Sequence, residues 1–476
     1  MLKAKFGKLW HIHCTLFVVM RQGIRRVKRS FMGIFAAICV VVSTPAHAKI
    51  PFPLNLLPDY ALRIIYYEQT LKVLDGSDPN YLARDSNRQN PRYKPSPNNF
   101  FPIKTYWISE DDLRTFSSGS FEGDLRNHFV RTRNGRREYR FFVHPESKGY
   151  YKEFLKRAVP AEDYIAVPLA SARTLLTFRP DNPKDIFFVK VSLDREVGES
   201  VRLIRDRHVT NAIGTSDLLE RVRGEGHFPD HFKFMAETFG AVPHDMEKGG
   251  MIVRPFPEEL KNSNYAPLFA LYGQKDASTP PLLAEMIARS KENPIDYIRN
   301  RLIRPFVSHW FDLATRFGLT MEPHGQNVLV RIENDGLING NFLHRDLNGF
   351  NLDFDHLKKI GLSEEIKRMP YISNRESEHF QYKIQSQIPS SLEYFEKTVL
   401  FDLDERISSW MRKGWIPKTP WGINPLKGLF HLEIEAEFIH RTGDTARYKD
   451  QLKYLEKPIN TFRDKCGPSV KRLIKK

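Results

Sequence analysis

Residues 318–355 have the sequence GLTMEPHGQNVLVRIENDGLINGNFLHRDLNGFNLDFD, and this stretch decides the fold. Helically spaced apolar residues lead up to it, so we expect a helix to end before Gly318. Val328–Ile332 and Gly340–Leu343 flank a turn at Asn334-Asp335-Gly336, which predicts a β-hairpin. The segment HGQN would precede the first strand, and Arg345-Asp346 would follow the second. Adjacent strands bring these ends together, so the polar residues should converge on one point.

The polar residues at these strand ends suit phosphate chemistry. The amide oxygen of Asn327 and the carboxylate of Asp346 are hard ligands of the kind that Mg²⁺ prefers. Arg345 and His324 can neutralise charge on a phosphoryl group. A plainer interpretation stays open, in which His324 is a buried histidine whose hydrogen bonds are satisfied beside a tight turn.

A second polar set lies upstream. Ser171-Ala172-Arg173-Thr174 precedes the predicted strand Leu175–Phe178, and Lys190 lies on the next predicted strand, Ile186–Val191. A hydroxyl, a guanidinium and an ammonium group at the ends of paired strands can hold a polyphosphate. The alternative is a surface arginine beside a solvated lysine.

Two smaller sets complete the pattern. His144-Pro145-Glu146-Ser147-Lys148 offers an imidazole and an ammonium group, although an ordinary loop has the same composition. Val209-Thr210-Asn211 offers a hydroxyl and an amide, although these residues also cap helices.

In chain order, these sets resemble the IucA/IucC family of siderophore synthetases, which make siderophores without a nonribosomal peptide template. The order is HPxxK, SxRT, a strand lysine, VTN, a strand arginine at Arg254, HGQN and RD. The resemblance spans roughly Phe142–Asp355, and HGQN is its most specific part. It implies a thumb–fingers–palm fold and a role in siderophore biosynthesis and iron acquisition.

The resemblance also implies an ATP- and Mg²⁺-dependent ligase that condenses a carboxylate, often that of citrate, with an amine or alcohol. It implies catalytic roles for His324, Arg173 and Lys190. The implied ATP-binding residues are Ser171, Arg173, Thr174, Lys190, His324, Gln326 and Arg345. The implied substrate-binding residues are His144, Lys148, Thr210 and Arg254. The implied metal ligands are Asn327 and Asp346.

The physical logic agrees with this reaction. A carboxylate is a poor electrophile, and an acyl-adenylate turns its oxygen into a good leaving group. Because the attack builds negative charge at phosphorus, cations placed there beforehand accelerate it.

One departure from the family pattern concerns the carboxylate. The family usually has an arginine four residues after the threonine of its TSxxR-like segment, and here that position is Gly214. A bidentate carboxylate clamp is then missing.

Two alternative functions stay open beside the ligase: an exported, non-catalytic relative that binds a polycarboxylate or siderophore, and a kinase-like phosphotransferase. No Gly-rich phosphate loop precedes HGQN, which weighs against the phosphotransferase.

The fold class we predict is α+β, with a central antiparallel sheet region and a largely helical C-terminal region. Helices are expected at Tyr60–Leu74, Tyr151–Ala158, Asp206–Val222, Pro281–Lys291, Pro294–Phe317, Leu392–Trp410 and Leu429–Thr442. The predicted organisation is a signal peptide (1–48), a thumb-like domain (49–165), a β-rich fingers-like domain (166–295) and a palm-like domain (296–476).

The first 48 residues have the composition of a secretory leader. They hold eight Lys or Arg and no acidic residue, which is half of the chain's net charge of +16. A basic segment, Arg21–Arg29, precedes the apolar run Phe31–Val42, and Ala46-His47-Ala48 fits a signal-peptidase site. We therefore expect an exported protein, periplasmic or secreted, or a cytoplasmic one if this leader does not function. Only Cys466 would remain in the mature chain, which excludes an intramolecular disulfide.

The composition also limits the partners. Hydrophobic residues make up 41% and charged residues 27%, as in a globular protein. No apolar run reaches the roughly 20 residues of a membrane span, so we expect no integral span after removal of the leader. The basic C-terminus (Lys471–Lys476) lacks interleaved aromatic residues, so we expect no nucleic-acid partner. The partners that stay open are small-molecule substrates and a second copy of this chain in a homodimer.

Overall fold

The structure is a computed structural model. It describes residues 52–71, 90–197, 200–224, 232–321, 323–352, 354–362, 395–396, 399–400, 403–419 and 425–442. The predicted leader, the basic C-terminus and Cys466 lie outside these ranges. Among the described residues, no helix combines the length and the apolar character that a membrane crossing requires.

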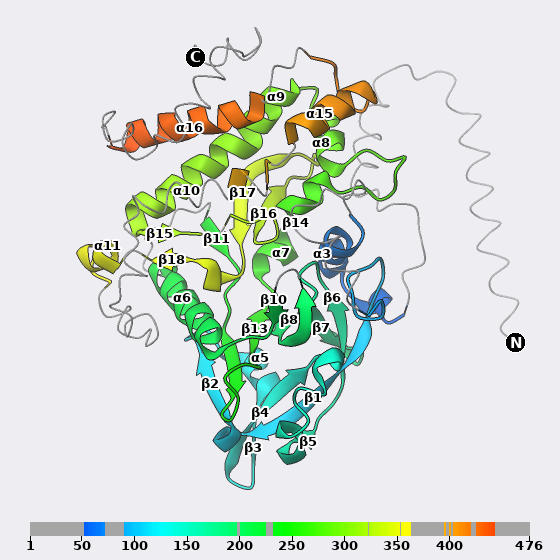
Figure 1. The fold of residues 1–476 in the computed structure, drawn as a ribbon, viewed down its shortest axis with the longest axis vertical. Helices are drawn as coiled ribbons and strands as arrows, with labels where there is room; N and C mark the ends of the chain where they lie inside the picture. Colours follow the sequence, from blue (N-terminus) through cyan, green and yellow to red (C-terminus); the bar gives the residue numbers. More distant parts are fainter. Residues whose placement is uncertain are drawn as a thin grey trace, which may run out of the picture. The chain divides into compact units, whose positions relative to one another are not determined.

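A ten-stranded sheet forms the larger of the two main sheets, and its pairings are antiparallel (Figure 1). Its strands, in spatial order, are β2 (Leu113–Ser117), β12 (Phe239–Pro243), β13 (Met251–Pro255), β8 (Asn182–Val191), β7 (Thr174–Arg179), β6 (Tyr164–Pro168), β1 (Phe101–Ser109), β4 (Arg136–Val143) and β3 (Val130–Arg133). A tenth strand, β5 (Val159–Pro160), pairs with β1. The sheet curls, so that Phe142 N on β4 donates to Met251 Sδ on β13.

The two faces of this sheet carry different residues because side chains alternate along a strand. On β8, Phe187, Val189 and Val191 point into an aromatic core enclosed by the curl. Phe188 and Lys190 belong to the opposite face. Because side chains alternate along β8, Lys190 lies on the outer face of the curl, together with Phe188.

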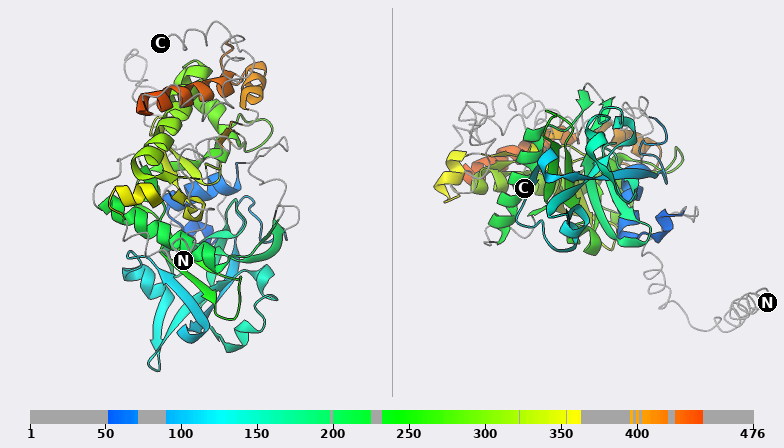
Figure 2. Two further views of the ribbon diagram at one scale, coloured as in Figure 1. Left: turned by 60° about the vertical axis from the view of Figure 1, so that its left-hand side comes forward. Right: turned by 90° about the horizontal axis from the view of Figure 1, so that it is seen from below.

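A four-stranded sheet covers part of that face. It consists of β11 (Phe232–Phe234), β17 (Ile338–His344), β16 (Val328–Ile332) and β14 (Asn264–Pro267), in that order. Its Leu329 and Leu343 pack with Phe188 of the large sheet, whereas Val328 and Phe342 pack with the helical core. The small sheet thus lies between the large sheet and the helices (Figures 1 and 2).

The helical core is built mainly from residues beyond 280. Its helices are α8 (Leu282–Ser290), α9 (Pro294–Ile298), a π-helical turn (Arg299–Ile303), α10 (Arg304–Phe317), α15 (Leu403–Arg412) and α16 (Pro425–Thr442). The buried stripe of α10 includes Phe306, Trp310 and Leu313, and the helix ends where Gly318 adopts a left-handed φ of 63°. Ion pairs of Glu433 with Arg299 and Arg304 fix α16 to this layer.

Other helices flank the sheets. They are α3 (Asp59–Gln69), α5 (Gly123–Phe129), α6 (Asp206–Gly224), α7 (Glu258–Asn262) and α11 (Phe354–Lys359). The remaining strand pairs are β9 (Leu193–Val197) with β10 (Ser200–Arg202), and β15 (Leu319–Thr320) with β18 (Asn351–Leu352). On α6, Val209, Ala212 and Ile213 pack on Ile252 of β13.

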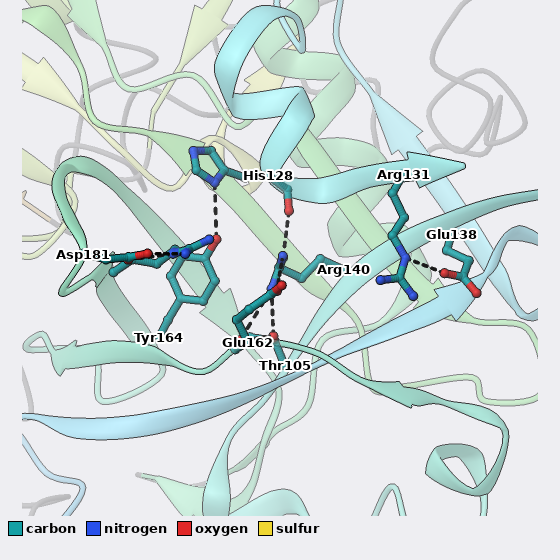
Figure 3. Close-up of polar contacts among 9 residues, drawn as sticks. Thr105, His128, Arg131, Glu138, Arg140, Glu162, Tyr164 and Asp181 are labelled. Atoms are coloured by element: carbon teal, nitrogen blue, oxygen red, sulfur yellow. Dashed lines mark hydrogen bonds and ion pairs between the residues drawn. The ribbon is translucent and has the colours of Figure 1, made fainter. Parts of the chain in front are cut away.

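A buried arginine holds α5 against the curled sheet (Figure 3). Arg140 Nε donates to the carbonyl of His128 (2.7 Å), and its terminal nitrogens donate to the hydroxyl of Thr105 (3.0 Å) and to Glu162 (2.8 Å). Its guanidinium lies 4.4 Å from the ring centre of Trp107. Five donors on a planar fork satisfy several partners at once, as a buried guanidinium requires.

The α+β class and the antiparallel sheet are confirmed, and most predicted elements are present. The hairpin predicted around Asn334-Asp335-Gly336 is β16–β17, and the helix predicted at Asp206–Val222 is α6. One element is corrected: the helix expected at Tyr151–Ala158 is only a 3₁₀ turn at Phe154–Arg157. Part of Leu392–Trp410 lies outside the described residues. The predicted domain boundaries remain predictions.

Candidate functional site

The polar residues flanking the β16–β17 hairpin lie side by side. Val328 pairs with His344, so the residues beyond them meet, and Arg345 N donates to the carbonyl of Asn327 (2.9 Å). The sequence-based expectation that these ends converge is confirmed at the level of the backbone. The HGQN segment is a turn in which Asn327 N donates to the carbonyl of His324 (2.8 Å).

Lys190 on the large sheet reaches this hairpin. Its Nζ donates to Asp346 Oδ1 over 2.6 Å, and the Lys190 side chain is only 10% exposed. Asp346 adopts a left-handed backbone (φ 63°), an uncommon conformation for a residue other than glycine. This ion pair joins the large sheet to the end of the small sheet.

Asp346 is held as a carboxylate by its neighbours. Burial alone would raise its pKa, but the positive charges of Lys190, Arg173 and Arg254 and the hydrogen bond from Lys190 hold that pKa well below its usual range. The group is therefore anionic at neutral pH, as a metal ligand or a partner of cations has to be.

Arg173 extends from the turn before β7. Ala172 adopts a left-handed φ of 64°, and the hydroxyl of Ser171 accepts a hydrogen bond from Thr174 N (3.0 Å). Arg173 Nη1 donates to the carbonyl of Arg202 (3.1 Å). Burial lowers the pKa of Arg173 to about 10, with Arg202 adding to this effect and Asp346 opposing it. Thr174 lies opposite Lys190 in the sheet.

Arg254, on β13, is tied to a buried acid. Its Nη2 donates to Glu237 Oε1 (2.7 Å), and Glu237 is fully buried. The other oxygen of Glu237 accepts from Leu347 N (3.1 Å), directly after Asp346. Arg254 Nε is buried and has no hydrogen-bond partner among the described residues. An orphaned guanidinium donor next to Asp346 is a binding capacity that the protein itself does not use.

Arg345 is tied to a second buried acid. Its Nη1 donates to Glu68 Oε1 (2.5 Å), and its Nε donates to the carbonyl of Gln326 (2.5 Å). Glu68 comes from α3, and its other oxygen accepts from Ala170 N (3.0 Å). Arg345 is thus oriented by α3 and by the HGQN turn together.

We refer to Arg173, Lys190, Arg254 and Arg345 as the cationic cluster. Three of its members pair with Asp346, Glu237 and Glu68. Arg173 forms no ion pair with a carboxylate among the described residues. The cluster therefore carries more positive than negative charge, which favours an anionic ligand.

His324 is buried at the edge of this cluster. Its Nδ1 accepts a hydrogen bond from Gln326 N (3.1 Å), so the proton of the neutral ring resides on Nε2. Burial, followed by the charge of Arg345, lowers its pKa to about 4, although Asp346 opposes this shift. At neutral pH the ring is an uncharged N–H donor.

His144, Lys148 and Thr210, which were expected to bind the substrate, have other contacts than the residues of the cationic cluster. His144 is fully buried, packs edge-on against Tyr93 and Phe101, and its Nδ1 accepts from Glu146 N (3.2 Å). The side chain of Lys148 is exposed, and the hydroxyl of Thr210 donates to the carbonyl of Asp206 (3.1 Å).

Within the described ranges, no hydrogen bond or ion pair joins His144, Lys148 or Thr210 to the cationic cluster. Gly214 is half-buried on α6, one turn beyond Thr210. The roles predicted for His144, Lys148 and Thr210 remain predictions.

Two acids of the site were not found by sequence reasoning. Glu68 lies in a segment expected only to be helical, and Glu237 lies in a stretch without a recognised motif. No local pattern marks them, because each is defined by a partner far along the chain: Arg345 is 277 residues from Glu68.

A divalent cation would have few protein ligands here. Among the described residues, no group of three His, Cys, Asp or Glu side chains is arranged to hold a metal ion. The predicted ligands Asn327 and Asp346 supply one amide and one carboxylate. Mg²⁺ in phosphate-handling sites typically uses one or two carboxylates, substrate phosphates and water, so this donor set fits Mg²⁺ only together with a phosphate ligand.

Comparisons with known proteins agree with the resemblance seen in the sequence. The model of the IucA/IucC family matches residues 143–273. The NRPS-independent siderophore synthetase-like protein ankE of Aspergillus thermomutatus is 26% identical over 212 residues, which is 41% of this chain and 33% of ankE. The chain therefore spans about a third of the length of this curated relative.

Two solved structures share the fold. ATP-bound aerobactin synthetase IucA from a hypervirulent pathotype of Klebsiella pneumoniae aligns with a TM-score of 0.55 and 16% identity, over 80% of this chain and 71% of IucA. Petrobactin biosynthesis protein AsbB from Bacillus anthracis str. Sterne aligns with a TM-score of 0.56 and 18% identity, over 74% of this chain and 63% of AsbB. The predicted synthetase-like architecture is confirmed.

Proposed function

We propose that the chain is a siderophore-synthetase-like ligase that uses ATP to condense a carboxylate with an amine or alcohol. The observation that carries this proposal is the cationic cluster gathered around Asp346, with its surplus positive charge and an orphaned donor at Arg254. The match to the IucA/IucC family over residues 143–273 and the shared fold with ATP-bound IucA support it.

The first step forms an acyl-adenylate. A carboxylate oxygen of the substrate attacks the α-phosphorus of ATP, and the bond from that phosphorus to the oxygen of the leaving pyrophosphate breaks. Negative charge grows on the phosphoryl oxygens, and in this proposal Arg173, Lys190 and Arg254 stabilise it. Cations that are already held in place need little rearrangement as this charge develops.

The second step releases AMP. The nitrogen or oxygen of the nucleophile attacks the acyl carbon, the bond from that carbon to the phosphate oxygen breaks, and the nucleophile loses its proton to solvent water. The neutral His324 donates from Nε2 to an α-phosphate oxygen in both steps. The negative charge of the phosphate offsets that of Arg345, while burial continues to lower the pKa of the ring, so that it stays a neutral donor.

Asp346 and Asn327 would hold Mg²⁺ together with the ATP phosphates. When bound, Mg²⁺ neutralises phosphate charge and aligns the leaving pyrophosphate. Lys190, which donates to Asp346 in the free protein, would then turn its ammonium group toward phosphate. The low pKa of Asp346 supports this assignment, because a carboxylate has to be ionised to serve as a ligand.

The identity of the carboxylate is a separate question. Gly214 provides no side chain one turn beyond Thr210, where the family usually has an arginine. We therefore propose a carboxylate that carries fewer negative charges than citrate.

The test is pyrophosphate release from ATP, measured with panels of carboxylates and of amines or alcohols. The proposal expects release that depends on a carboxylate and Mg²⁺, with monocarboxylates better than citrate, and a strong loss in Lys190→Met. Lys104→Met is the matched control, because Lys104 is an exposed strand lysine paired with Asp163.

Other outcomes would replace the proposal. Tight citrate or siderophore binding without pyrophosphate release would indicate a binding protein, and release of ADP would indicate a phosphotransferase. Export through residues 1–48 is proposed independently, on the leader composition. Cell fractionation with N-terminal sequencing tests it: a chain beginning near Lys49 outside the cytoplasm supports export, and would place the protein away from cellular ATP.

A further inference from the structure

Glu237 joins three elements of the fold around the cationic cluster. Its Oε1 accepts from Arg254 Nη2 on β13 (2.7 Å), and its Oε2 accepts from Leu347 N (3.1 Å), directly after Asp346. Its own backbone N donates to Ser216 Oγ on α6 (2.8 Å). Glu237 is fully buried, so water competes for neither oxygen. One side chain therefore sets the distance between Arg254 and the turn that carries Asp346.

Glu237 takes the place of Asp346 in satisfying the 3₁₀ turn Leu347–Gly349. The first amides of such a turn have no acceptor within it, and an aspartate just before the turn commonly supplies one. Asp346 occupies that position, but its carboxylate caps no amide of the turn. Glu237 accepts from Leu347 N instead. The Asp346 carboxylate is therefore left to face Lys190, and its side chain is still 30% exposed, so a ligand can reach it.

The same buried acid orients the guanidinium of Arg254. Glu237 holds Nη2, whereas Nε has no hydrogen-bond partner in the described part of the chain. Because the guanidinium is planar and rigid, fixing one nitrogen limits the directions in which the others point. A donor that is held in place before binding loses less conformational freedom when an anion binds.

The charge of Glu237 by itself would oppose an anionic ligand. A carboxylate repels a phosphate in the same cluster, so a neutral residue at this position should tighten binding if only net charge mattered. A role in positioning predicts the opposite sign, because Arg254 then loses its fixed orientation. The sign of the change in affinity separates the two roles.

We propose that Glu237 is a positioning residue of the phosphate site, which fixes Arg254 and the turn that carries Asp346 relative to each other. The inference rests on the proposed function in that it assigns a phosphate ligand to the cationic cluster. Glu237 itself touches neither the phosphate nor Mg²⁺ and acts through Arg254 and Leu347.

The experiment is calorimetry of inorganic triphosphate binding to the full chain, without and with Mg²⁺, at a temperature where circular dichroism shows each variant folded. Glu237→Gln has one amide oxygen, so it faces Arg254 or Leu347 N with an N–H group. Glu237→Asp keeps the charge but is one methylene shorter. The matched control is Glu433→Gln, because Glu433 is a buried acid that also accepts from two arginines, in the helical layer.

The proposal expects both Glu237 variants to bind triphosphate several-fold more weakly than the wild type, although Glu237→Gln makes the cluster more positive. Glu433→Gln should match the wild type. Without Mg²⁺, adding Glu237→Gln to Arg254→Met should cause no further loss, because the residue through which Glu237 acts is already gone. With Mg²⁺ the loss in Glu237→Gln should be larger, since the turn that carries Asp346 is loosened as well.

Wild-type or tighter binding by Glu237→Gln would overturn the proposal, and wild-type binding by Glu237→Asp would do so if the glutamine variant does not fold. The full loss from Glu237→Gln in the Arg254→Met background would also overturn it, because Glu237 would then not act through Arg254. An equal loss with and without Mg²⁺ would reject the part that concerns Asp346.

The same titrations separate this inference from the proposed function. Triphosphate binding with the expected loss in Glu237→Gln, but no carboxylate-dependent pyrophosphate release by the wild type, would support the positioning role and reject the ligase. Pyrophosphate release by the wild type, with undiminished triphosphate binding by Glu237→Gln, would support the ligase and reject the role of Glu237. A wild type that binds neither triphosphate nor ATP would reject both.

Discussion

Lys190 Nζ lies 2.6 Å from Asp346 Oδ1, although 156 residues separate the two in sequence. Lys190 comes from the large curled sheet and Asp346 from the end of the small sheet. This ion pair is therefore a contact between two layers of the fold and also the centre of the proposed site. Its loss should affect both stability and ligand binding.

Lys190→Met should lower the free energy of unfolding by about 2–3 kcal/mol, because a hydrogen bond between charged groups is lost. The pKa of Asp346 should rise, since burial then acts with one cation fewer. Triphosphate affinity should fall at least 10-fold, measured by calorimetry. Lys190→Arg, which keeps the charge, should lose less, and equal losses in both variants would speak against a role for the charge.

Glu68→Ala should destabilise the protein by about 3–5 kcal/mol, because it leaves the buried guanidinium of Arg345 without its partner. Chemical denaturation of the variant measures this loss. Glu162→Ala is the control, since Glu162 also pairs with a buried arginine but is 57% exposed, and its loss should stay near 1 kcal/mol. Similar losses in the two variants would contradict the assignment of Glu68 as the essential partner of Arg345.

Acidification from pH 7 to pH 5 should destabilise the protein through His144. Burial lowers the pKa of His144 to about 4, so the unfolded chain, with an ordinary pKa near 6.5, binds more protons in this window. The stabilising effect of the neutral ring is present above pH 6.5 and is lost as pH falls toward 4. At pH 5 the free energy of unfolding is lower by about 2 kcal/mol as a result.

Urea denaturation of the wild type and His144→Gln at both pH values checks this prediction. The variant should show a pH dependence that is smaller by that amount. Parallel curves for the two proteins would contradict a neutral, buried His144.

Arg140→Lys should destabilise the curled sheet without disturbing the site. The substitution keeps the charge but removes the fork that donates to His128, Thr105 and Glu162 (Figure 3). We expect a loss of about 2 kcal/mol by denaturation. Triphosphate affinity at a temperature where the variant is folded should equal that of the wild type, and a 10-fold change would place Arg140 in the binding machinery.

Much of the fold could be predicted from local patterns. The strands β7 and β8 and the β16–β17 hairpin follow from alternation and turn residues, and α10 follows from its apolar stripe and Gly318. The prediction of a helix at Tyr151–Ala158 is wrong, because it took the apolar spacing of Tyr151 and Phe154 for that of a helix. Both residues are buried in the aromatic core. Their i, i+3 spacing fits a 3₁₀ turn, in which such residues eclipse, as well as a helix.

The site could be predicted only where the strand ends define it. The meeting of Asn327 with Arg345 follows from hairpin geometry, and this could be anticipated. The partners of the cations could not: Glu237 and Glu68 are fixed by packing between distant elements.

The dependence of Arg345 on Glu68 also limits how far the chain can be trimmed. Glu68 stands on the last turn of α3, which begins at Asp59, and α3 supplies Ile64 and Ile65 to the core shared by the two sheets. Whichever initiation codon or protease defines the mature N-terminus, the cut has to fall upstream of Asp59 for Arg345 to keep its buried counter-ion. An expression plasmid that starts inside this helix should yield a protein impaired both in folding and in nucleotide handling.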